Sequence, residues 1–277
     1  MKTQINTKER EVDGLAIRYA ESDSAGDETI LLLNPWPESL FAWETIWSRL
    51  AETARLVAID LPGFGHSEGR PDLFSPQPMG TFLLQLIDEW ELGHPHVVGP
   101  DVATGATLFA AAQDADRFTS AVVGSGATSV PLEVTGPLKE LIEAPDTSGY
   151  QALDGRDIVA GALDGIEQHA LSDAVREDYL TSYAGDRFVQ SMAYVRNYPS
   201  DLPVLAEKLG EIRTPVQIIA GRHDALVPPS NAEFLDGRLS ESKLDILETG
   251  HFTWEDGADQ YLELTRAWVE SHPRRPI

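Results

Sequence analysis

Three side chains in this sequence have the types and the spacing needed for hydrolysis through a covalent intermediate. Asp101 follows a short strand-like run at residues 96–98 and stands between Gly99 and Ala103, two positions before and after it. Small residues at these positions let a strand turn sharply into a helix, and the central side chain then projects from the turn. A carboxylate in that place can attack carbon directly, because no base has to deprotonate it first.

Two further candidates stand at equivalent places later in the chain. Asp224 follows the apolar run 216–220, and His251 follows the run 244–247. Side chains just beyond the carboxyl ends of parallel strands gather at one edge of the sheet, so we expect both residues near Asp101. His251 would activate water as a general base, and Asp224 would orient the imidazole.

Each of these residues also has a structural interpretation. Asp101 and Asp224 could cap the helices that follow them, and His251 could be an ordinary buried or surface histidine. The catalytic interpretation is favoured because all three stand at matching strand ends. No serine or threonine replaces Asp101 at the turn, since Thr104 comes three residues later. The other six histidines are interpreted as structural: His66, His94, His96, His169, His223 and His272.

The elements that must position these residues alternate along the chain, as a mainly parallel sheet covered by helices on both faces requires. Residues 9–20 predict a hairpin that turns at Asp13-Gly14. Buried strands are predicted at 29–33, 55–59, 96–98, 121–123, 216–220 and 244–247. Helices are predicted near 39–51, 78–92, 103–114, 229–238 and 257–271.

The alternation stops between residues 130 and 209. Helical segments interrupted by proline and glycine occupy this stretch, and no strand-like run occurs in it. We therefore expect an α/β core at residues 1–129 and 210–277. The inserted residues 130–209 are expected to form an all-helical lid, or cap, over the active edge of the sheet.

Composition limits the classes of partner. The 277 residues carry a formal charge of −24, which argues against nucleic acid and anionic membranes. The absence of cysteine excludes disulfides, zinc–thiolate sites and a cysteine nucleophile. The first ten residues lack the apolar stretch of a signal peptide, and no run approaches the roughly 18 apolar residues of a membrane span. We expect a cytoplasmic protein with a small-molecule substrate, and a homodimer is compatible with the sequence.

The chain resembles the α/β-hydrolases that use an aspartate nucleophile, such as epoxide hydrolases, haloalkane dehalogenases and haloacetate dehalogenases. It shares their chain order of nucleophile, acid and histidine. Residues 60–67 (Asp-Leu-Pro-Gly-Phe-Gly-His-Ser) are similar to their D-x-x-G-x-G-x-S turn. The resemblance spans nearly the whole chain. It implies an α/β-hydrolase fold with a helical lid and a catalytic triad that needs no metal or organic cofactor.

The resemblance also implies an oxyanion hole made of two backbone N–H groups. One belongs to Val102, directly after the nucleophile, and the other to Trp36 in the loop 34–37 (Asn-Pro-Trp-Pro). Epoxide hydrolases and dehalogenases carry His-Gly-x-Pro there, so this chain has Asn-Pro in place of His-Gly. A plain turn is the alternative. Trp36 and Phe252 are also expected to contact the substrate.

The leaving group decides which reaction follows. Haloalkane dehalogenases place tryptophan after the nucleophile, where this chain has Val102, and haloacetate dehalogenases place arginines nearby, whereas the first one here is Arg117. Epoxide hydrolases use lid tyrosines to protonate the opening ring. The predicted lid contains Tyr150, Tyr179, Tyr183, Tyr194 and Tyr198. Tyr150 and Tyr198 are the most family-like pair, with Tyr194 as a substitute and substrate contact.

Hydrolysis of a small epoxide to a vicinal diol is therefore the preferred prediction. A haloalkane or haloacid dehalogenase with the same ester intermediate is the nearest alternative. A non-catalytic ligand-binding protein, and a lyase or isomerase in which Asp101 transfers protons, are alternatives of other classes.

Overall fold

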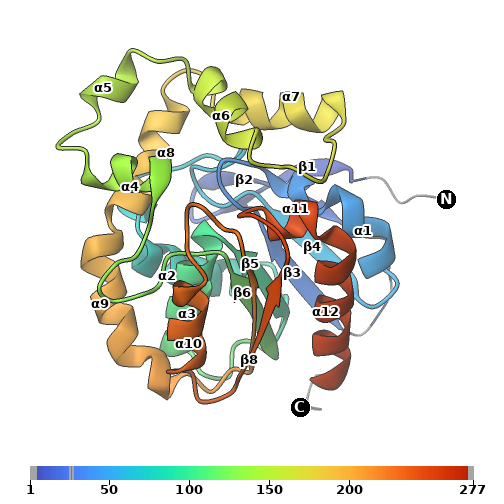
Figure 1. The fold of residues 1–277 in the computed structure, drawn as a ribbon. Helices are drawn as coiled ribbons and strands as arrows, with labels where there is room; N and C mark the ends of the chain where they lie inside the picture. Colours follow the sequence, from blue (N-terminus) through green and yellow to red (C-terminus); the bar gives the residue numbers. More distant parts are fainter. Residues whose placement is uncertain (1–4, 25, 27, 274–277) are drawn as a thin grey trace.

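A mainly parallel eight-stranded sheet forms the centre of the protein, in a computed structural model that describes residues 5–24, 26 and 28–273 (Figure 1). The strand order across the sheet is β1-β2-β4-β3-β5-β6-β7-β8. Strands β1 and β2 are antiparallel to their neighbours, and all pairs from β4 onward are parallel. The strands are β1 (Thr7–Val12), β2 (Leu15–Glu21), β3 (Thr29–Leu33), β4 (Arg55–Ile59), β5 (His96–Pro100), β6 (Ser120–Gly124), β7 (Val216–Gly221) and β8 (Ser242–Leu247).

The predicted strands are confirmed, and the N-terminal hairpin has the expected turn. Asp13 and Gly14 have φ angles of 51° and 75°, so both occupy the left-handed region that a two-residue hairpin turn of the primed type requires. The strands end within three residues of their predicted bounds, because runs of buried apolar residues bounded by turn signals specify such strands well.

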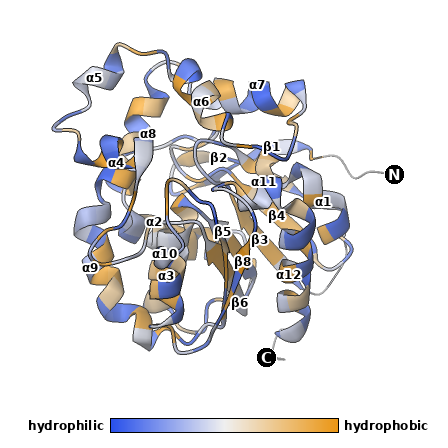
Figure 2. Ribbon diagram, in the orientation of Figure 1, coloured by the Kyte–Doolittle hydropathy of each residue, from blue (hydrophilic) through white to orange (hydrophobic). Residues whose placement is uncertain are grey.

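Alternate side chains of the central strands pack against helices on opposite faces. Ile30 and Leu32 belong to a core with α1 (Glu44–Leu50) and α12 (Ala258–Ser271). Leu31 and Leu33 point the other way, into a core with α2 (Pro76–Glu89), α3 (Val102–Gln113) and α10 (Ser230–Asp236). This period of two is what a strand buried on both faces requires. The central strands are accordingly largely apolar, whereas β1 is polar and exposed and α12 carries both apolar and polar residues (Figure 2).

Several helix bounds differ from the prediction for local reasons. The segment predicted at 39–51 divides into a 3₁₀ turn, η1 (Leu40–Trp43), followed by α1. Helix α2 begins two residues early, because Pro76 is well suited to the first helical turn. A separate short helix, α11 (Thr253–Asp256), precedes α12. Two further 3₁₀ turns are η2 (Pro71–Leu73) and η3 (Leu209–Glu211).

Only helices and loops occupy the segment between β6 and β7. These helices lie above and beside the carboxyl ends of the strands in Figure 1, in the place expected of a lid. The domain limits at residues 130 and 209 remain predictions. The helices are α4 (Gly136–Glu143), α5 (Ser148–Gln151), α6 (Gly155–Leu163), α7 (Asp173–Ser182), α8 (Arg187–Arg196) and α9 (Tyr198–Lys208).

The Asp60–Ser67 turn joins the core to these helices. The buried Asp60 carboxylate accepts hydrogen bonds from the backbone N–H groups of Leu40 and His66, at 2.6 and 2.8 Å. Arg18 pairs with Asp60 at 3.3 Å and with Asp178 of α7 at 2.6 Å. The motif therefore serves as a structural junction close to the active edge.

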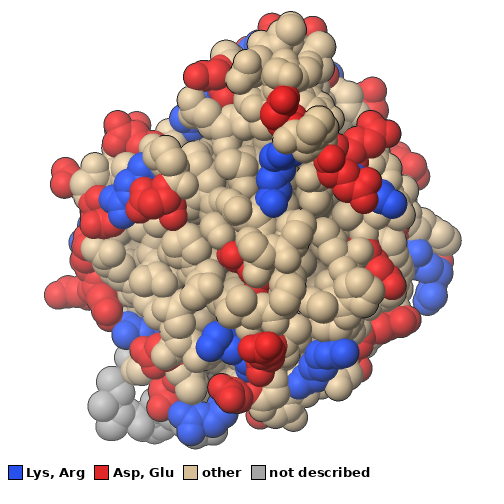
Figure 3. All heavy atoms as spheres, turned by 90° about the vertical axis from the view of Figure 1, so that its left-hand side faces the viewer, with Lys and Arg blue, Asp and Glu red and all other residues tan. Residues whose placement is uncertain are grey.

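Charged groups surround the side of the protein shown in Figure 3, with acidic and basic side chains interspersed. This distribution is what a solvated acidic surface would show. Among the described residues, no helix is long and apolar enough to cross a membrane. The same residues contain no cluster of three histidine or acidic side chains able to hold a metal ion.

Candidate active site

Asp101 occupies the sharp turn between β5 and α3. Its φ of 52° and ψ of −125° lie outside the regions that ordinary residues favour, so the turn is strained. The backbone N–H of Asp101 donates to the Gly124 oxygen at 2.8 Å and holds the turn against β6. A Cβ on Gly99 would lie 2.5 Å from Thr107 Oγ1, which explains the small residue there. The elbow predicted from the sequence is present.

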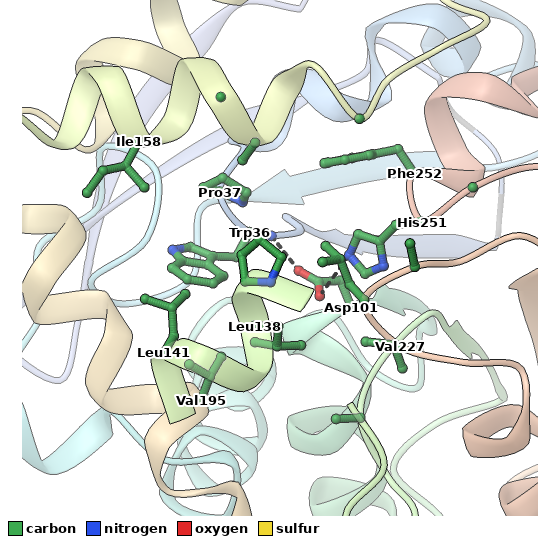
Figure 4. Close-up of a pocket in the computed structure, with 18 of the residues that line it drawn as sticks. Trp36, Pro37, Asp101, Leu138, Leu141, Ile158, Val195, Val227, His251 and Phe252 are labelled. Atoms are coloured by element: carbon green, nitrogen blue, oxygen red, sulfur yellow. Dashed lines mark hydrogen bonds and ion pairs between the residues drawn. The ribbon is translucent and has the colours of Figure 1, made fainter. Parts of the chain in front are cut away.

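The two carboxylate oxygens of Asp101 face different groups (Figure 4). Oδ2 accepts a hydrogen bond from the backbone N–H of Trp36 at 2.7 Å. Oδ1 lies 3.6 Å from Nε2 of His251, within ion-pair range. One oxygen is thus held by a fixed donor, while the other stands beside a potential base.

His251 is oriented by Asp224. Its Nδ1 lies 2.8 Å from Asp224 Oδ2, and an ionised carboxylate can only accept, so Nδ1 carries the proton. The other Asp224 oxygen accepts from the backbone N–H groups of Leu226 and Val227, at 2.9 and 2.8 Å. All three of Asp101, Asp224 and His251 are buried, with 7% of each residue exposed. The expected triad residues are therefore brought together in one row, with a hydrogen bond between His251 and Asp224 and an ion-pair contact between His251 and Asp101.

The two carboxylates control the charge of the histidine. Burial by itself lowers the pKa of His251, but the nearby negative charges of Asp224 and Asp101 outweigh it and raise the pKa to about 10. The resting site thus favours an imidazolium paired with Asp101. Removing the charge of Asp101 would leave only one carboxylate beside the ring and lower the pKa of His251 again.

The loop 34–37 is held in place despite its unusual sequence. Asn34 Oδ1 accepts from the backbone N–H of Leu61 at 2.7 Å, and Asn34 Nδ2 donates to the Pro35 oxygen at 2.9 Å. The Trp36 indole donates to Ser191 Oγ of α8 at 2.9 Å. These contacts aim the Trp36 N–H at Asp101 without the histidine and glycine of the family pattern.

The second expected oxyanion donor is Val102. It is the first residue of α3, and an N–H in the first turn of a helix has no carbonyl partner within the helix. Such a group is free to bind an oxyanion and also lies at the positive end of the helix dipole.

A cavity of about 490 Å³ lies between the strand ends and the lid helices, with Asp101 and His251 in its wall. Side chains from α4, α6 and α8 lie around it in Figure 4. Among the described residues that line it, none is lysine or arginine, and Glu167 and His223 add polar groups. Its apolar lining residues include Trp36, Pro37, Leu138, Leu141, Ile158, Phe188, Val195, Leu226, Val227 and Phe252.

Comparison with known proteins agrees with this architecture. Residues 28–258, more than half of the 277, match the family model described as the alpha/beta hydrolase fold. The chain belongs to the alpha/beta hydrolase fold family. It is therefore a hydrolase of this fold, as the resemblance predicted.

Individual relatives of this hydrolase differ in activity. It is 24% identical over 259 residues to the 2-hydroxy-6-oxononadienedioate/2-hydroxy-6-oxononatrienedioate hydrolase of Escherichia coli (strain K12), covering 86% of each chain. A putative lipase (lip1) from Acinetobacter baumannii AYE has a TM-score of 0.81 at 18% identity, over 96% of this chain and 91% of the lipase. The epoxide hydrolase CorEH has a TM-score of 0.80 at 16% identity, over 97% and 99% of the two chains. At these identities the structures establish only a common fold.

The structure separates the lid tyrosines by location. Tyr198 lines the cavity, and burial raises the pKa of its hydroxyl well above the usual value, so the hydroxyl keeps its proton. Tyr194 does not line the cavity, because its hydroxyl donates to the backbone oxygen of Val102 at 2.9 Å. Tyr150 lies in α5, half-buried, and is also absent from the cavity wall. Of the expected Tyr150–Tyr198 pair, Tyr198 lines this cavity and Tyr150 does not.

Several contributing residues were missed from the sequence. Ser191 holds the Trp36 indole, and Phe188 stacks on it with ring centroids 5.2 Å apart. Glu38 and Glu255 are buried close to the site. Glu38 directly follows the loop 34–37, and Glu255 comes four residues after His251. This closeness in sequence to expected site residues could have identified both.

An Asp224→Asn variant of this hydrolase should slow hydrolysis of an ester intermediate by about 10²–10⁴-fold, because the imidazole loses its orienting charge. The fold should survive, since an asparagine oxygen can still accept from the N–H groups of Leu226 and Val227. Single-turnover kinetics and thermal unfolding would measure the two effects. Asp259→Asn, a change at a side chain that is 84% exposed, is the matched control. Unchanged hydrolysis in Asp224→Asn would contradict the triad assignment.

An Asp101→Asn variant should lower the pKa of His251 from its value of about 10, because one of the two nearby negative charges is removed. NMR titration of the imidazole in the two proteins would measure the change. Asp224 is intact in both, so the difference isolates the contribution of Asp101. An equal or higher pKa in the variant would show that the two groups do not interact.

Proposed function

We propose that this hydrolase opens small, uncharged epoxides to vicinal diols through an ester on Asp101. The proposal rests on the different surroundings of the two Asp101 oxygens. Oδ2 accepts a hydrogen bond from the Trp36 N–H, so Oδ1 is the oxygen available to attack a ring carbon. Thr104 is unsuited to be the nucleophile instead, because its hydroxyl is hydrogen-bonded to the Gly99 and Gly124 oxygens.

In the first step, Oδ1 of Asp101 attacks a ring carbon and the carbon–oxygen bond of the epoxide breaks. The ring oxygen takes the proton of the Tyr198 hydroxyl, because Tyr198 is the tyrosine among the described residues that line the cavity with Asp101. The carboxylate becomes an alkyl ester, with Oδ2 as its carbonyl oxygen. Asp101 is then neutral, which lowers the pKa of His251. The imidazolium therefore returns a proton through solvent to the Tyr198 phenolate, and the neutral imidazole can act as a base.

In the second step, His251 takes a proton from water, and the oxygen attacks the ester carbonyl. The Trp36 and Val102 N–H groups stabilise the negative charge that develops on Oδ2. Collapse of this intermediate releases the diol and restores the carboxylate. The proton that His251 takes from water restores the imidazolium, and the alcohol leaving the ester takes the remaining proton of that water, so the net reaction adds one water to the epoxide.

Halide is the less suitable leaving group, because the positions that would hold halide in a dehalogenase offer no free side-chain donor here. Val102 has no donor in its side chain, and the Trp36 indole N–H already donates to Ser191. No lysine or arginine is found among the described cavity residues to receive a substrate carboxylate. An uncharged epoxide fits this apolar cavity better than a haloacid does.

A substrate panel tests the proposal. Apolar epoxides, haloalkanes, haloacids and carboxylic esters would be incubated with the protein, and diol, halide and acid release would be measured. We expect diol from apolar epoxides and no release of halide. Halide release with every epoxide intact would replace the proposal by dehalogenation. Ligand binding without any conversion would favour a binding protein.

A further inference from the structure

Two glutamates that do not belong to the triad are buried close to the loop 34–37, here called the oxyanion loop. Glu38 follows the Trp36–Pro37 segment and has no exposed surface, and Glu255 in α11 is 3% exposed. Burying an isolated carboxylate is costly unless it is paired or hydrogen-bonded, so two adjacent buried acids require an explanation. The mechanism above uses neither.

The two carboxyl groups lie beside each other, close enough to interact by charge and by hydrogen bonding. Outside this contact, Glu38 Oε2 accepts from the Trp254 indole at 2.8 Å, and Glu255 Oε1 accepts from the Tyr179 hydroxyl at 3.1 Å. No N–H or O–H donor among the described residues reaches Glu38 Oε1. Two ionised carboxylates only accept, so a hydrogen bond between them needs one shared proton.

The surroundings also favour one proton on the pair. Burial and the charge of Glu255 raise the pKa of Glu38 well above its usual value. Burial raises the pKa of Glu255 to about 7. The other titratable groups facing the pair are mostly acidic: Asp101, Glu44, Asp256, Tyr179 and His169, whose Nε2 lies 3.6 Å from Glu255.

The pair contacts three parts of the protein that surround the site: the oxyanion loop, the segment that carries His251, and helix α7. Glu38 is two residues after Trp36, and its backbone oxygen accepts from the Tyr183 hydroxyl at 2.9 Å. The Trp254 ring that binds Glu38 packs edge-on against the His251 ring, with centroids 5.9 Å apart. Tyr179 belongs to α7, so the pair also reaches the lid.

We propose that Glu38 and Glu255 form a proton-sharing carboxyl pair. The pair holds the oxyanion loop in place against the loop that carries His251 and against α7 of the lid. Both are positioning residues: they touch no reacting atom and act by holding the Trp36 N–H and the His251 ring. The catalytic part rests on the proposed function, whereas the proton sharing does not.

The pair makes folding stability depend on pH with a defined sign. A carboxyl whose pKa is higher in the folded protein stabilises the fold fully below its unfolded value of 4.5, and this contribution is lost as the pH rises through about 7. Glu38→Gln should abolish most of this dependence, because its amide can donate to Glu255 and accept from Trp254 at any pH. Thermal unfolding of both proteins from pH 4.5 to above 7 would measure it. Glu263→Gln, at an exposed position of α12, is the matched control.

Infrared spectroscopy gives a second test that needs no substrate. At neutral pH the wild type should show the carbonyl band of a protonated carboxylic acid, and Glu38→Gln should lose that band. The Glu263→Gln control should keep it. If the band is absent from the wild type and the Tm of Glu38→Gln follows pH as the wild type does, the proton-sharing pair is wrong.

Turnover tests the positioning role. Glu38→Ala should lower kcat on the order of 10²-fold, as expected of a misplaced catalytic group, with little change in KM. Glu38→Gln should retain most of the activity. If the alanine variant does not fold, kcat of the glutamine variant tests the positioning role. Wild-type kcat in folded Glu38→Ala, or loss of kcat in Glu38→Gln, would overturn the positioning role. If the wild type opens no epoxide, the proposed function fails while the infrared and unfolding tests still decide the pair.

Discussion

A His251→Gln variant is expected to accumulate an alkyl ester on Asp101 and to lose turnover. Glutamine has no basic nitrogen with which to activate water, so ester hydrolysis should slow by at least the 10²–10⁴-fold usually attributed to a general base, about 3–5 kcal/mol. The first attack needs only the carboxylate and Tyr198, and both remain. The intermediate should therefore form faster than it disappears.

Mass spectrometry of the digested protein would detect this intermediate. The peptide that contains Asp101 should gain the mass of the intact epoxide, and the gain should be absent when Asp101 is also replaced by alanine. An adduct at another residue would move the nucleophile elsewhere. If turnover stops and no epoxide in the panel leaves an adduct, the covalent mechanism is wrong.

A Tyr198→Phe variant is expected to lose epoxide opening by about 10²-fold or more, the usual scale of a positioned acid. An epoxide oxygen leaves as an alkoxide that remains attached to the substrate, so it needs a proton at the site. Phenylalanine keeps the ring, whose edge-to-face contact with Tyr194 has a centroid distance of 6.0 Å, and packing should persist. Thermal unfolding would check this while kcat is measured.

Two other tyrosines provide matched controls for this change. Tyr150→Phe should leave kcat nearly unchanged, because Tyr150 does not line the cavity. Tyr194→Phe should have a smaller effect than Tyr198→Phe, since it removes a hydrogen bond to the Val102 backbone and no substrate contact. A larger loss in Tyr194→Phe than in Tyr198→Phe would keep the reaction class and transfer the proton donor to Tyr194.

Local sequence was sufficient to predict the strands of the sheet and to assign Asp101, Asp224 and His251 to the ends of three of them. Strand ends in a parallel sheet share one edge, so Asp101, Asp224 and His251 could be assigned to that edge without knowing any distance. The elbow is similarly local, because the contact that would block a Cβ on Gly99 is with Thr107, in the helix that follows the turn. Helix bounds such as Pro76 at the start of α2 were less certain, since caps and prolines shift an end by one or two residues.

The lid was different, because a helical pattern predicts that a helix exists and not where its outward-facing side chains are directed. Tyr150, Tyr194 and Tyr198 are the same residue type in one segment. Only packing places the Tyr198 ring in the cavity wall and directs the Tyr194 hydroxyl to Val102. The Glu38–Glu255 contact joins residues more than two hundred positions apart, and neither glutamate alone differs in sequence from a solvated one. The sequence by itself determined which groups stand at the strand ends, because backbone periodicity decides that. The tertiary structure alone decided which tyrosine lines the cavity with the nucleophile and which acids are buried together, because burial and long-range contacts decide those.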